Sequence, residues 1–474
     1  MLRKTKIIAT VGPACEQYES ILELAKTGVN VFRLNFSHGA YEQHEKVINN
    51  IRRVNTEYGM NIAILADLQG PKLRIGMMEN NGVLFEEGET ITFTPVEVIG
   101  NKEKVYMSYP GFANDVKVGE TVLLDDGKIE TKVTNVSVNG EVKAIVINSG
   151  VLSSKKGVNL PDTKVSLPSL TEKDLSDLDF IIAHQIEWVG LSFVRKPEDI
   201  KHLRAIIKKN DSCAKIIAKI EKPEALEHLL EIIRITDAVM IARGDLGVEL
   251  PLEKIPRIQR DIVRKCIHRA KPVIIATQMM ESMMTRTRPN RSEISDVANA
   301  VLEGADAVML SGETAMGDHP TLVVKTMSEI IVETEKEESV YNRNLTPQEH
   351  SPSFLSDALC YNACRISEDI HANALIGMTQ SGYTGFMLSS FRPEAPLFVF
   401  TVTQSLVNQL SLSWGVQAFY YPHGENIDKI IFDQIDVLKE KGFLKEGDVV
   451  VNTGSIPVPA ALPTNMIKIT KVNW

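Results

Sequence analysis

The sequence predicts an α/β protein: an eight-stranded β/α (TIM) barrel with an inserted β-barrel lid domain and a C-terminal domain built on an open α/β sheet. Eight short apolar runs are each followed by a helical period, and this alternation breaks once, between about 71 and 160. Near-continuous apolar strands that alternate with helices are typical of a parallel sheet. Eight such units complete a barrel, whose active site lies at the carboxyl ends of the strands.

The eight predicted strands share an apolar start and a polar end. They occupy residues 5–12, 29–37, 61–69, 187–194, 215–221, 237–245, 271–279 and 305–313. Amphipathic segments between them, such as PEDIKHLRAIIKKN and PEALEHLLEIIR, open with Pro-Glu, which favours the first turn of a helix. The polar ends therefore gather where a barrel places its active site.

The break in alternation divides the chain into three predicted domains. Residues 1–70 and 161–340 form the barrel, and 71–160 form the β-rich lid, which enters and leaves on the catalytic face. A polar linker leads to 350–474, where ALIGMTQ, PLFVFTVT and GDVVVNTG read as strands of an open sheet.

Composition narrows the functional class. The 474 residues carry a formal net charge of −9, so no basic field attracts nucleic acid. No apolar run approaches the roughly 20 residues of a membrane span, and the N-terminal apolar stretch is too short for a secretory signal. The five cysteines lack metal-site spacing, which fits a reducing compartment. We expect a cytoplasmic protein without nucleic-acid or membrane partners.

Polar side chains lie at or just beyond the carboxyl ends of the predicted strands. Because strand side chains alternate, Lys219 and Glu221 project to the same side. The full set is Arg33, Asn35, Ser37, Asp67, Gln69, Lys72, Arg74, Lys219, Glu221, Arg243, Asp245, Thr277, Gln278, Ser311 and Glu313. Two carboxylates from adjacent strands, Glu221 and Asp245, would hold Mg²⁺ and leave the rest of its shell to substrate and water.

The remaining cations suit phosphoryl chemistry. Arg33 and Arg74 offer donors to a phosphoryl group, and Lys219 faces charge that develops on that group or on an enolate oxygen. The alternative is that Lys219–Glu221 and Arg243–Asp245 are structural ion pairs. Charged and polar residues at five strand ends favour a functional site, because burying charges that serve only a structural role is energetically costly.

Long motifs resemble the pyruvate kinase family over essentially the whole chain. They are TKIIATVGPA, VFRLNFSHG, GVNLP, AKIEKPEAL, MIARGDLGVELP, ATQMMESM and RPNRSEISDVANAVLEGADAVMLSGETAMG. The resemblance implies Mg²⁺-dependent phosphoryl transfer from phosphoenolpyruvate to ADP in glycolysis, with Mn²⁺ as a substitute ion. It also implies protonation of enolpyruvate to pyruvate, a second divalent cation with the nucleotide, and a homotetramer.

The resemblance also implies residue roles. Glu221 and Asp245 hold the metal, Lys219 stabilises the transferring phosphoryl group and the enolate, and Thr277 helps to protonate the enolate through water. Arg33 contacts phosphate, and backbone amides of Gly244 and Asp245 bind the substrate carboxylate. We expect Asn35, His38 and Arg74 at the nucleotide; for His38 the alternative is a local hydrogen bond.

One motif departs from the potassium-dependent branch of the family. That branch reads DTKGPEIR, whereas residues 67–74 read DLQGPKLR. Asn35, Ser37 and Asp67 match the monovalent-cation site, but Leu68 removes a hydroxyl ligand. Lys72 would supply the missing positive charge, so we expect no potassium requirement. The alternative is a solvated hinge charge.

The C-terminal domain carries a candidate effector site. TQSGYTG (379–385) follows a strand, and Thr379, Ser381 and Thr384 could cradle a phosphate or simply cap a helix. The family places a sugar-phosphate effector at such a loop. Tyr383 stands where Arg or Lys often follows the glycine, and the loop 454–465 lacks an obvious phosphate-binding cation. Two alternatives follow: a phosphorylated effector other than fructose 1,6-bisphosphate, or no effector.

Two other classes compete. A metal-dependent carbon–carbon lyase would use similar carboxylates but would not explain the inserted domain. A regulatory protein without catalysis would usually have lost Lys219, Glu221, Asp245 or Thr277, and all four are present.

Overall fold

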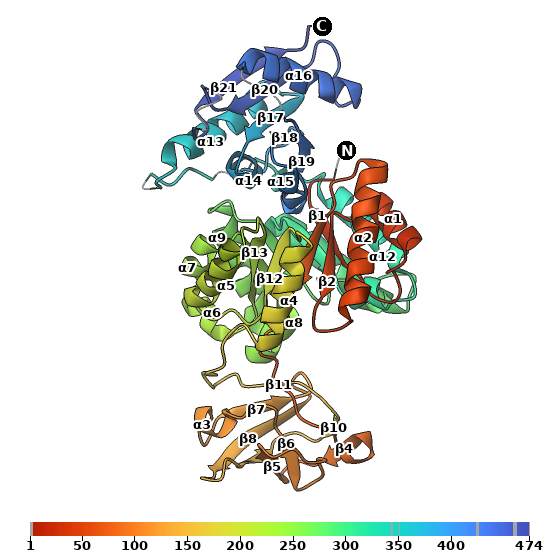
Figure 1. The fold of residues 1–474 in the computed structure, drawn as a ribbon, viewed down its shortest axis with the longest axis vertical. Helices are drawn as coiled ribbons and strands as arrows, with labels where there is room; N and C mark the ends of the chain where they lie inside the picture. Colours follow the sequence, from red (N-terminus) through yellow and green to blue (C-terminus); the bar gives the residue numbers. More distant parts are fainter. Residues whose placement is uncertain (1–2, 343–344, 350, 423–425, 458–461, 474) are drawn as a thin grey trace.

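The computed structural model describes residues 3–342, 345–349, 351–422, 426–457 and 462–473. Three units follow one another along the long axis, with the barrel in the middle, the inserted lid at one end and the C-terminal domain at the other (Figure 1). The predicted fold class is confirmed. The predicted domain limits stay predictions, and residue 350, where the third domain was expected to begin, lies outside the described residues.

The barrel is closed and parallel, in the order β1-β16-β15-β14-β13-β12-β3-β2. Each of the eight predicted runs contains one of its strands. They are β1 (Lys6–Thr10), β2 (Val31–Asn35), β3 (Ala63–Asp67), β12 (Trp188–Leu191), β13 (Lys215–Ile220), β14 (Ala238–Ala242), β15 (Val273–Ala276) and β16 (Ala307–Leu310).

Alternate residues of each strand enter two different cores. Ile217 packs inside the barrel with Val31, Leu65 and Trp188, whereas Ile216 packs outward against the helices. Both faces are buried, which is why these strands read as continuous apolar runs. Because side chains alternate, Lys219 and Glu221 continue the inward face of Ile217.

Helices surround the barrel, mostly one or two after each strand. They are α1 (Tyr18–Thr27), α2 (Tyr41–Tyr58), α4 (Glu172–Ala183), α5 (Pro197–Lys209), α6 (Pro223–Glu227), α7 (Leu229–Ile235), α8 (Arg243–Glu249), α9 (Ile255–Ile267), α10 (Arg291–Glu303), α11 (Gly312–Ala315) and α12 (Pro320–Thr334). Short 3₁₀ turns lie at Leu252–Lys254, Glu281–Met284 and Glu338–Val340. No helix in the described part of the chain is long and apolar enough to cross a membrane.

The lid lies between β3 and β12 and has its own apolar core. Its six-stranded sheet has the order β11-β7-β8-β9-β5-β6, and β10 pairs with β4. Strand β8 alternates buried and exposed residues, as a half-buried strand should. The elements are a 3₁₀ turn (Glu79–Asn81), β4 (Gly82–Phe85), β5 (Thr90–Thr94), β6 (Lys104–Tyr106), α3 (Phe112–Asp115), β7 (Thr121–Leu124), β8 (Ile129–Val136), β9 (Val142–Val146), β10 (Gly150–Ser153) and β11 (Val158–Asn159).

The C-terminal domain is a five-stranded sheet in the order β19-β18-β17-β20-β21, with β21 antiparallel. The sequence predicted three of these strands and missed β19 and β21, whose residues VQAFY and MIKITK do not form continuous apolar runs. The elements are α13 (Phe354–Asp369), β17 (Ala374–Thr379), α14 (Tyr383–Ser390), β18 (Leu397–Thr401), α15 (Gln404–Gln409), a 3₁₀ turn (Leu410–Leu412), β19 (Val416–Tyr420), α16 (Ile427–Glu440), β20 (Val449–Gly454) and β21 (Met466–Lys471).

Candidate active site

Lys219 stands near the end of β13 at the mouth of the barrel and is only 8% exposed. Its ammonium lies 3.0 Å from Glu221 Oε1 and 3.1 Å from Asp67 Oδ1, and it donates to Ser192 Oγ at 2.7 Å. Burial lowers the pKa of Lys219, but Asp67 and Glu221 outweigh burial, so this pKa lies above its ordinary value. The ammonium therefore stays charged at neutral pH, ready to face an anionic group.

Arg33 shares Asp67 with Lys219. The Arg33 guanidinium approaches Asp67 Oδ2 through Nε at 2.7 Å and Nη2 at 2.6 Å, and Nη1 donates to Thr10 Oγ1 at 3.0 Å. A Cβ on Gly190 would lie 3.1 Å from Asp67 Oδ1, so the glycine leaves room for this carboxylate. Burial alone would raise the pKa of Asp67. The attraction to Lys219 and Arg33 is the larger effect, so the pKa of Asp67 lies below its usual range.

Glu221 and Asp245 form the candidate metal site. Glu221 is 1% exposed, and its Oε2 accepts the Phe193 N–H at 2.7 Å. Burial raises the pKa of Glu221. The positive charge of Lys219 lowers this pKa, the negative charge of nearby Asp245 raises it, and the net pKa lies above its ordinary value. A divalent cation would relieve the repulsion between the two carboxylates.

The donor set fits Mg²⁺ rather than a metal held wholly by protein. The described residues contain no group of three or more His, Cys, Asp or Glu side chains able to hold an ion. Mg²⁺ commonly takes one or two carboxylates and fills its octahedron with water and substrate oxygens. Glu221 and Asp245 meet that requirement.

Thr277 follows β15 in an unusual backbone conformation. Its φ is +71°, and that of Gln278 is +56°; a positive φ is an outlier for a β-branched residue. The Thr277 hydroxyl accepts the Gly244 N–H at 2.8 Å and donates to the Ala276 carbonyl at 2.5 Å. The hydroxyl is thus held beside the first turn of α8, which carries Asp245.

Arg243 and Glu313 hold the site's loops rather than facing its centre. The alternative pairing Arg243–Asp245 is not formed, because the Arg243 guanidinium pairs with both oxygens of Asp296 in α10 at 2.7 Å. It also donates to the Thr277 carbonyl at 2.7 Å. Glu313 is buried and accepts the Met280 and Ser311 N–H groups.

Of the residues expected at the nucleotide, Asn35 is in register with Asp67 on β3, whereas His38 and Arg74 have their contacts elsewhere. Asn35 Oδ1 accepts the Ser37 N–H at 3.1 Å, and His38 is exposed with its carbonyl bound to the His44 ring at 3.0 Å. Arg74 lies where the chain enters the lid and donates to the Lys155 carbonyl at 3.0 Å. Among the residues described by the structure, no hydrogen bond or ion pair joins Arg74 or His38 to the cluster around Lys219, so these assignments stay predictions.

Lys72 is exposed, and no ion pair or hydrogen bond joins its side chain to any other described residue. It lines a small cavity between the lid and the barrel, together with Asp126, Asn159, Lys222 and Asp245. Lys72 therefore borders the same interdomain space as Asp245, the second candidate metal ligand, while Asp67 is already covered by Arg33 and Lys219.

The three predicted effector residues line one cavity of about 540 Å³ in the C-terminal domain. Thr379 Oγ1 accepts the Gly382 N–H at 3.0 Å, and the hydroxyls of Thr384 and Thr464 lie 2.7 Å apart. Tyr383 is hydrogen-bonded to Asp357. The described lining contains neither lysine nor arginine. Part of the predicted loop 454–465, residues 458–461, lies outside the described residues.

Sequence reasoning missed Thr10 and Ser192, although a usable signal was present. Both have the inward parity of their strands, like Ile8 in β1 and Trp188 in β12, and both stand at or just beyond the carboxyl end of the strand. Asp296, by contrast, lies in a helix far along the chain, and no local pattern pointed to it.

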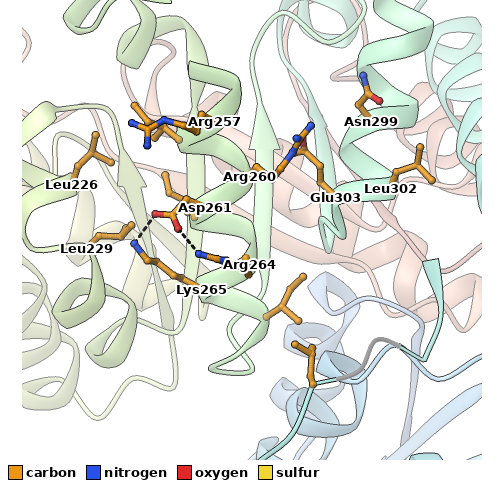
Figure 2. A pocket seen from close by; sticks show the side chains of 14 residues that line it. Leu226, Leu229, Arg257, Arg260, Asp261, Arg264, Lys265, Asn299, Leu302 and Glu303 are labelled. Carbon is orange, nitrogen blue, oxygen red and sulfur yellow. Dashed lines mark hydrogen bonds and ion pairs between the residues drawn. The ribbon is translucent and has the colours of Figure 1, made fainter. Parts of the chain in front are cut away.

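A cavity of about 990 Å³ lies away from the strand ends, along the outer side of α9. Figure 2 shows arginines and a lysine from α9 around it, with Asp261 paired to Arg264 and Lys265. Leucines such as Leu226, Leu229 and Leu302 supply its apolar part. None of the described residues that line this cavity belongs to the polar cluster at the barrel mouth.

Comparisons with known proteins agree with the geometry. Residues 2–324 match the model of the pyruvate kinase barrel domain, and 357–470 match that of the pyruvate kinase alpha/beta domain. A pyruvate kinase of Geobacillus stearothermophilus is 41% identical over 473 residues, 99% of this chain and 80% of that protein. One of Bacillus licheniformis is 39% identical over 471 residues, with the same coverage.

A solved structure described as a pyruvate kinase from Cryptosporidium parvum superposes with a TM-score of 0.93 at 33% identity. It covers 99% of this chain, which in turn covers 96% of it. The family models and the relatives together show that this chain belongs to the pyruvate kinase family.

Proposed function

We propose that Lys219, Glu221, Asp245 and Thr277 carry out the reaction of the family in this chain. That reaction is Mg²⁺-dependent phosphoryl transfer from phosphoenolpyruvate to ADP, a step of glycolysis that yields pyruvate and ATP. One observation carries the proposal: a buried ammonium, two carboxylates and a strained threonine meet at the mouth of one barrel.

The chain's own residues position and neutralise charge. When bound at Glu221 and Asp245, Mg²⁺ supplies charge neutralisation to substrate oxygens, and Mn²⁺ would substitute for it. Lys219 faces the phosphoryl group as the bond from phosphorus to the enol oxygen breaks and a bond to the terminal oxygen of ADP forms. Arg33 orients the phosphate through its guanidinium.

The second half-reaction needs a proton at the enolate carbon. Lys219 stabilises the enolate oxygen, and Thr277 relays a proton through water to the carbon. Because the Gly244 N–H already donates to the Thr277 hydroxyl at 2.8 Å, we assign the substrate carboxylate chiefly to the Asp245 N–H. Asn35, His38 and Arg74 are assigned to the nucleotide.

Pyruvate formation from phosphoenolpyruvate, ADP and Mg²⁺ tests the assignment. We expect turnover by the unaltered chain, and a kcat lowered by about 100-fold or more in Lys219→Met, because an electrostatic group aimed at developing charge is lost. Lys104→Met, which breaks the exposed Lys104–Glu141 pair in the lid, is the matched control. Absence of turnover with and without potassium would overturn the proposal.

We further propose that turnover needs no potassium, with Lys72 as the internal cation. Leu68 offers no hydroxyl ligand, and Lys72 lines the same cavity as Asp245. The chain should therefore turn over when a bulky organic cation replaces every potassium ion. Lys72→Glu should abolish this activity and recover it with potassium; full activity of Lys72→Glu without potassium would refute the assignment, leaving Lys72 a solvated hinge charge.

An effector site in the C-terminal domain is a further part of the proposal. Thr379, Ser381 and Thr384 line a 540 Å³ cavity whose described walls hold no lysine or arginine. Hydroxyls and amides without a cation suit a singly phosphorylated ligand better than fructose 1,6-bisphosphate. A sugar monophosphate should lower KM for phosphoenolpyruvate, and Thr384→Val should remove that effect; no response to any sugar phosphate would rule the site out.

We also propose a cytoplasmic homotetramer. The cavity of Figure 2 is the candidate contact between subunits on the barrel. Arg264 pairs with Asp261 within α9, and Arg260 pairs with Glu303 at the end of α10, so both signs of charge occur on one patch. Such a patch can pair with a second copy of itself about a two-fold axis. Sedimentation should give four chains per particle.

A further inference from the structure

Glu249, the last residue of α8, is a buried carboxylate that the proposed mechanism leaves unused. It is 4% exposed. Its Oε1 accepts hydrogen bonds from Asn159 Nδ2 at 2.8 Å and Lys222 Nζ at 2.5 Å. Asn159 belongs to the lid, and Lys222 directly follows Glu221. Asn159, Lys222 and Glu249 are called the Glu249 bridge below.

The Glu249 bridge joins the three segments that build the metal site and its cover. Asn159 is registered opposite Leu123 in the lid sheet, so it moves with that sheet. Lys222 holds the segment that presents Glu221, and Glu249 ends the seven-residue helix whose first turn contains Asp245. A short helix transmits displacement of one end to the other with little loss.

A second contact brings the lid to the same helix. Asp125, Asp126 and Gly127 have φ values of 51°, 57° and 84°, three successive left-handed residues in one lid turn. A Cβ on Gly127 would lie 3.7 Å from Val248 Cγ1, next to Glu249 in α8. The lid therefore contacts the final turn of α8 at Glu249 and passes close to it at Val248.

The second oxygen of Glu249 is a further sign of function. Glu249 Oε2 is buried and has no hydrogen-bond partner among the residues described here. Leaving a buried carboxylate oxygen unpaired is unfavourable, and such groups in native structures call for an explanation. A carboxylate selected only for stability would be better satisfied or replaced by an apolar side chain.

We propose that Glu249 is a positioning residue that couples the position of the lid to the spacing of Glu221 and Asp245. The inference rests on the metal role proposed for those two carboxylates. The Lys222–Glu249 interaction fixes the metal ligands relative to each other, and the Asn159–Glu249 hydrogen bond passes lid movement to them. Removing one of these interactions should therefore have a different effect from removing the other.

Two measurements that do not depend on turnover distinguish the Lys222–Glu249 interaction from the Asn159–Glu249 hydrogen bond. Mn²⁺ binding to the substrate-free enzyme, followed by electron paramagnetic resonance, should weaken about 10-fold in Lys222→Met, as for other partners that orient metal ligands. Lys222→Arg should restore it. Asn159→Ala should leave Mn²⁺ affinity unchanged but speed amide hydrogen exchange in the lid connections 72–76 and 155–160.

The remaining variants close the test. Glu249→Gln, which keeps an oxygen for Asn159 but loses the charge opposite Lys222, should weaken Mn²⁺ binding and leave lid exchange near normal. Lys104→Met, within the lid alone, should change neither quantity. If Lys222→Met and Asn159→Ala lower only the melting temperature, the Glu249 bridge is structural and the inference falls. Failure of pyruvate formation in the unaltered chain would instead overturn the proposed function.

Discussion

At the scale of single residues, Thr277 is the clearest case of structure held against local preference. A β-branched residue at φ +71° carries strain of order 1–3 kcal/mol. Three contacts impose the conformation: the Gly244 N–H, the Ala276 carbonyl and the Arg243 guanidinium, which binds the Thr277 carbonyl. The strained conformation fixes the direction of one hydroxyl, as the proton relay that we propose for Thr277 requires.

Thr277→Val should separate the hydroxyl from the shape of the side chain. Valine keeps the branched outline but cannot relay a proton, so we expect kcat to fall by about 100-fold with little change in KM for phosphoenolpyruvate. Thr277→Ser, which keeps the hydroxyl, is the control and should retain most of the activity. Steady-state kinetics would measure both, and an unchanged kcat in Thr277→Val would remove Thr277 from proton transfer.

At the scale of elements, one arginine joins the ends of two strands and a helix. Arg243 starts α8 after β14, binds the carbonyl of Thr277 after β15, and pairs with both oxygens of Asp296 in α10. A guanidinium makes these contacts together because its donors lie in one plane; an ammonium cannot reproduce that fork.

Arg243→Lys should therefore cost more than a conservative change suggests. We expect the free energy of unfolding to fall by about 2 kcal/mol, because hydrogen bonds to charged groups are lost, and kcat to fall as Thr277 loosens. Arg53→Lys, at the exposed pair with Glu57, is the matched control. Urea denaturation would compare them, and equal losses in the two variants would contradict the role given to Arg243.

At the scale of the whole molecule, the barrel and the C-terminal domain share a buried polar interface. Lys6 in β1 donates to the Val416 carbonyl at 2.7 Å, and Arg392 pairs with Asp306 at 3.0 Å. Burial, with Arg3 nearby, lowers the pKa of Lys6 to about 7. Lys6 is thus largely neutral in the folded protein above that pH but charged in the unfolded chain, up to about pH 10.

This difference predicts that stability rises with pH. Between about pH 7 and pH 10 the unfolded chain binds a proton at Lys6 that the folded chain does not, so the free energy of unfolding gains up to about 1.4 kcal/mol per pH unit. Lys6→Met should reduce the slope, with a remainder from Lys4, whose pKa burial lowers to about 8, and Lys201→Met, at an exposed lysine, should keep it. Urea midpoints at pH 7, 8 and 9 would decide, with equal slopes in all three proteins refuting the prediction.

The sequence by itself determined the barrel and the core of the site. Strand periodicity and alternation are local properties, so the eight strands could be placed, and Lys219 and Glu221 could be assigned to one side, without any knowledge of packing. Strands β13 and β14 are neighbours, which is why Glu221 and Asp245 could be expected together.

Only the tertiary structure decided which partner each charged group takes. Arg243 pairs with Asp296, 53 residues away, and Glu249 binds Asn159 across 90 residues. The left-handed turn at Thr277 has no signal in its own side chain. Such pairings depend on where helices and the lid come to rest, to within a fraction of an ångström. Hydrogen bonds tolerate little error in distance or angle, and periodicity carries no information at that precision.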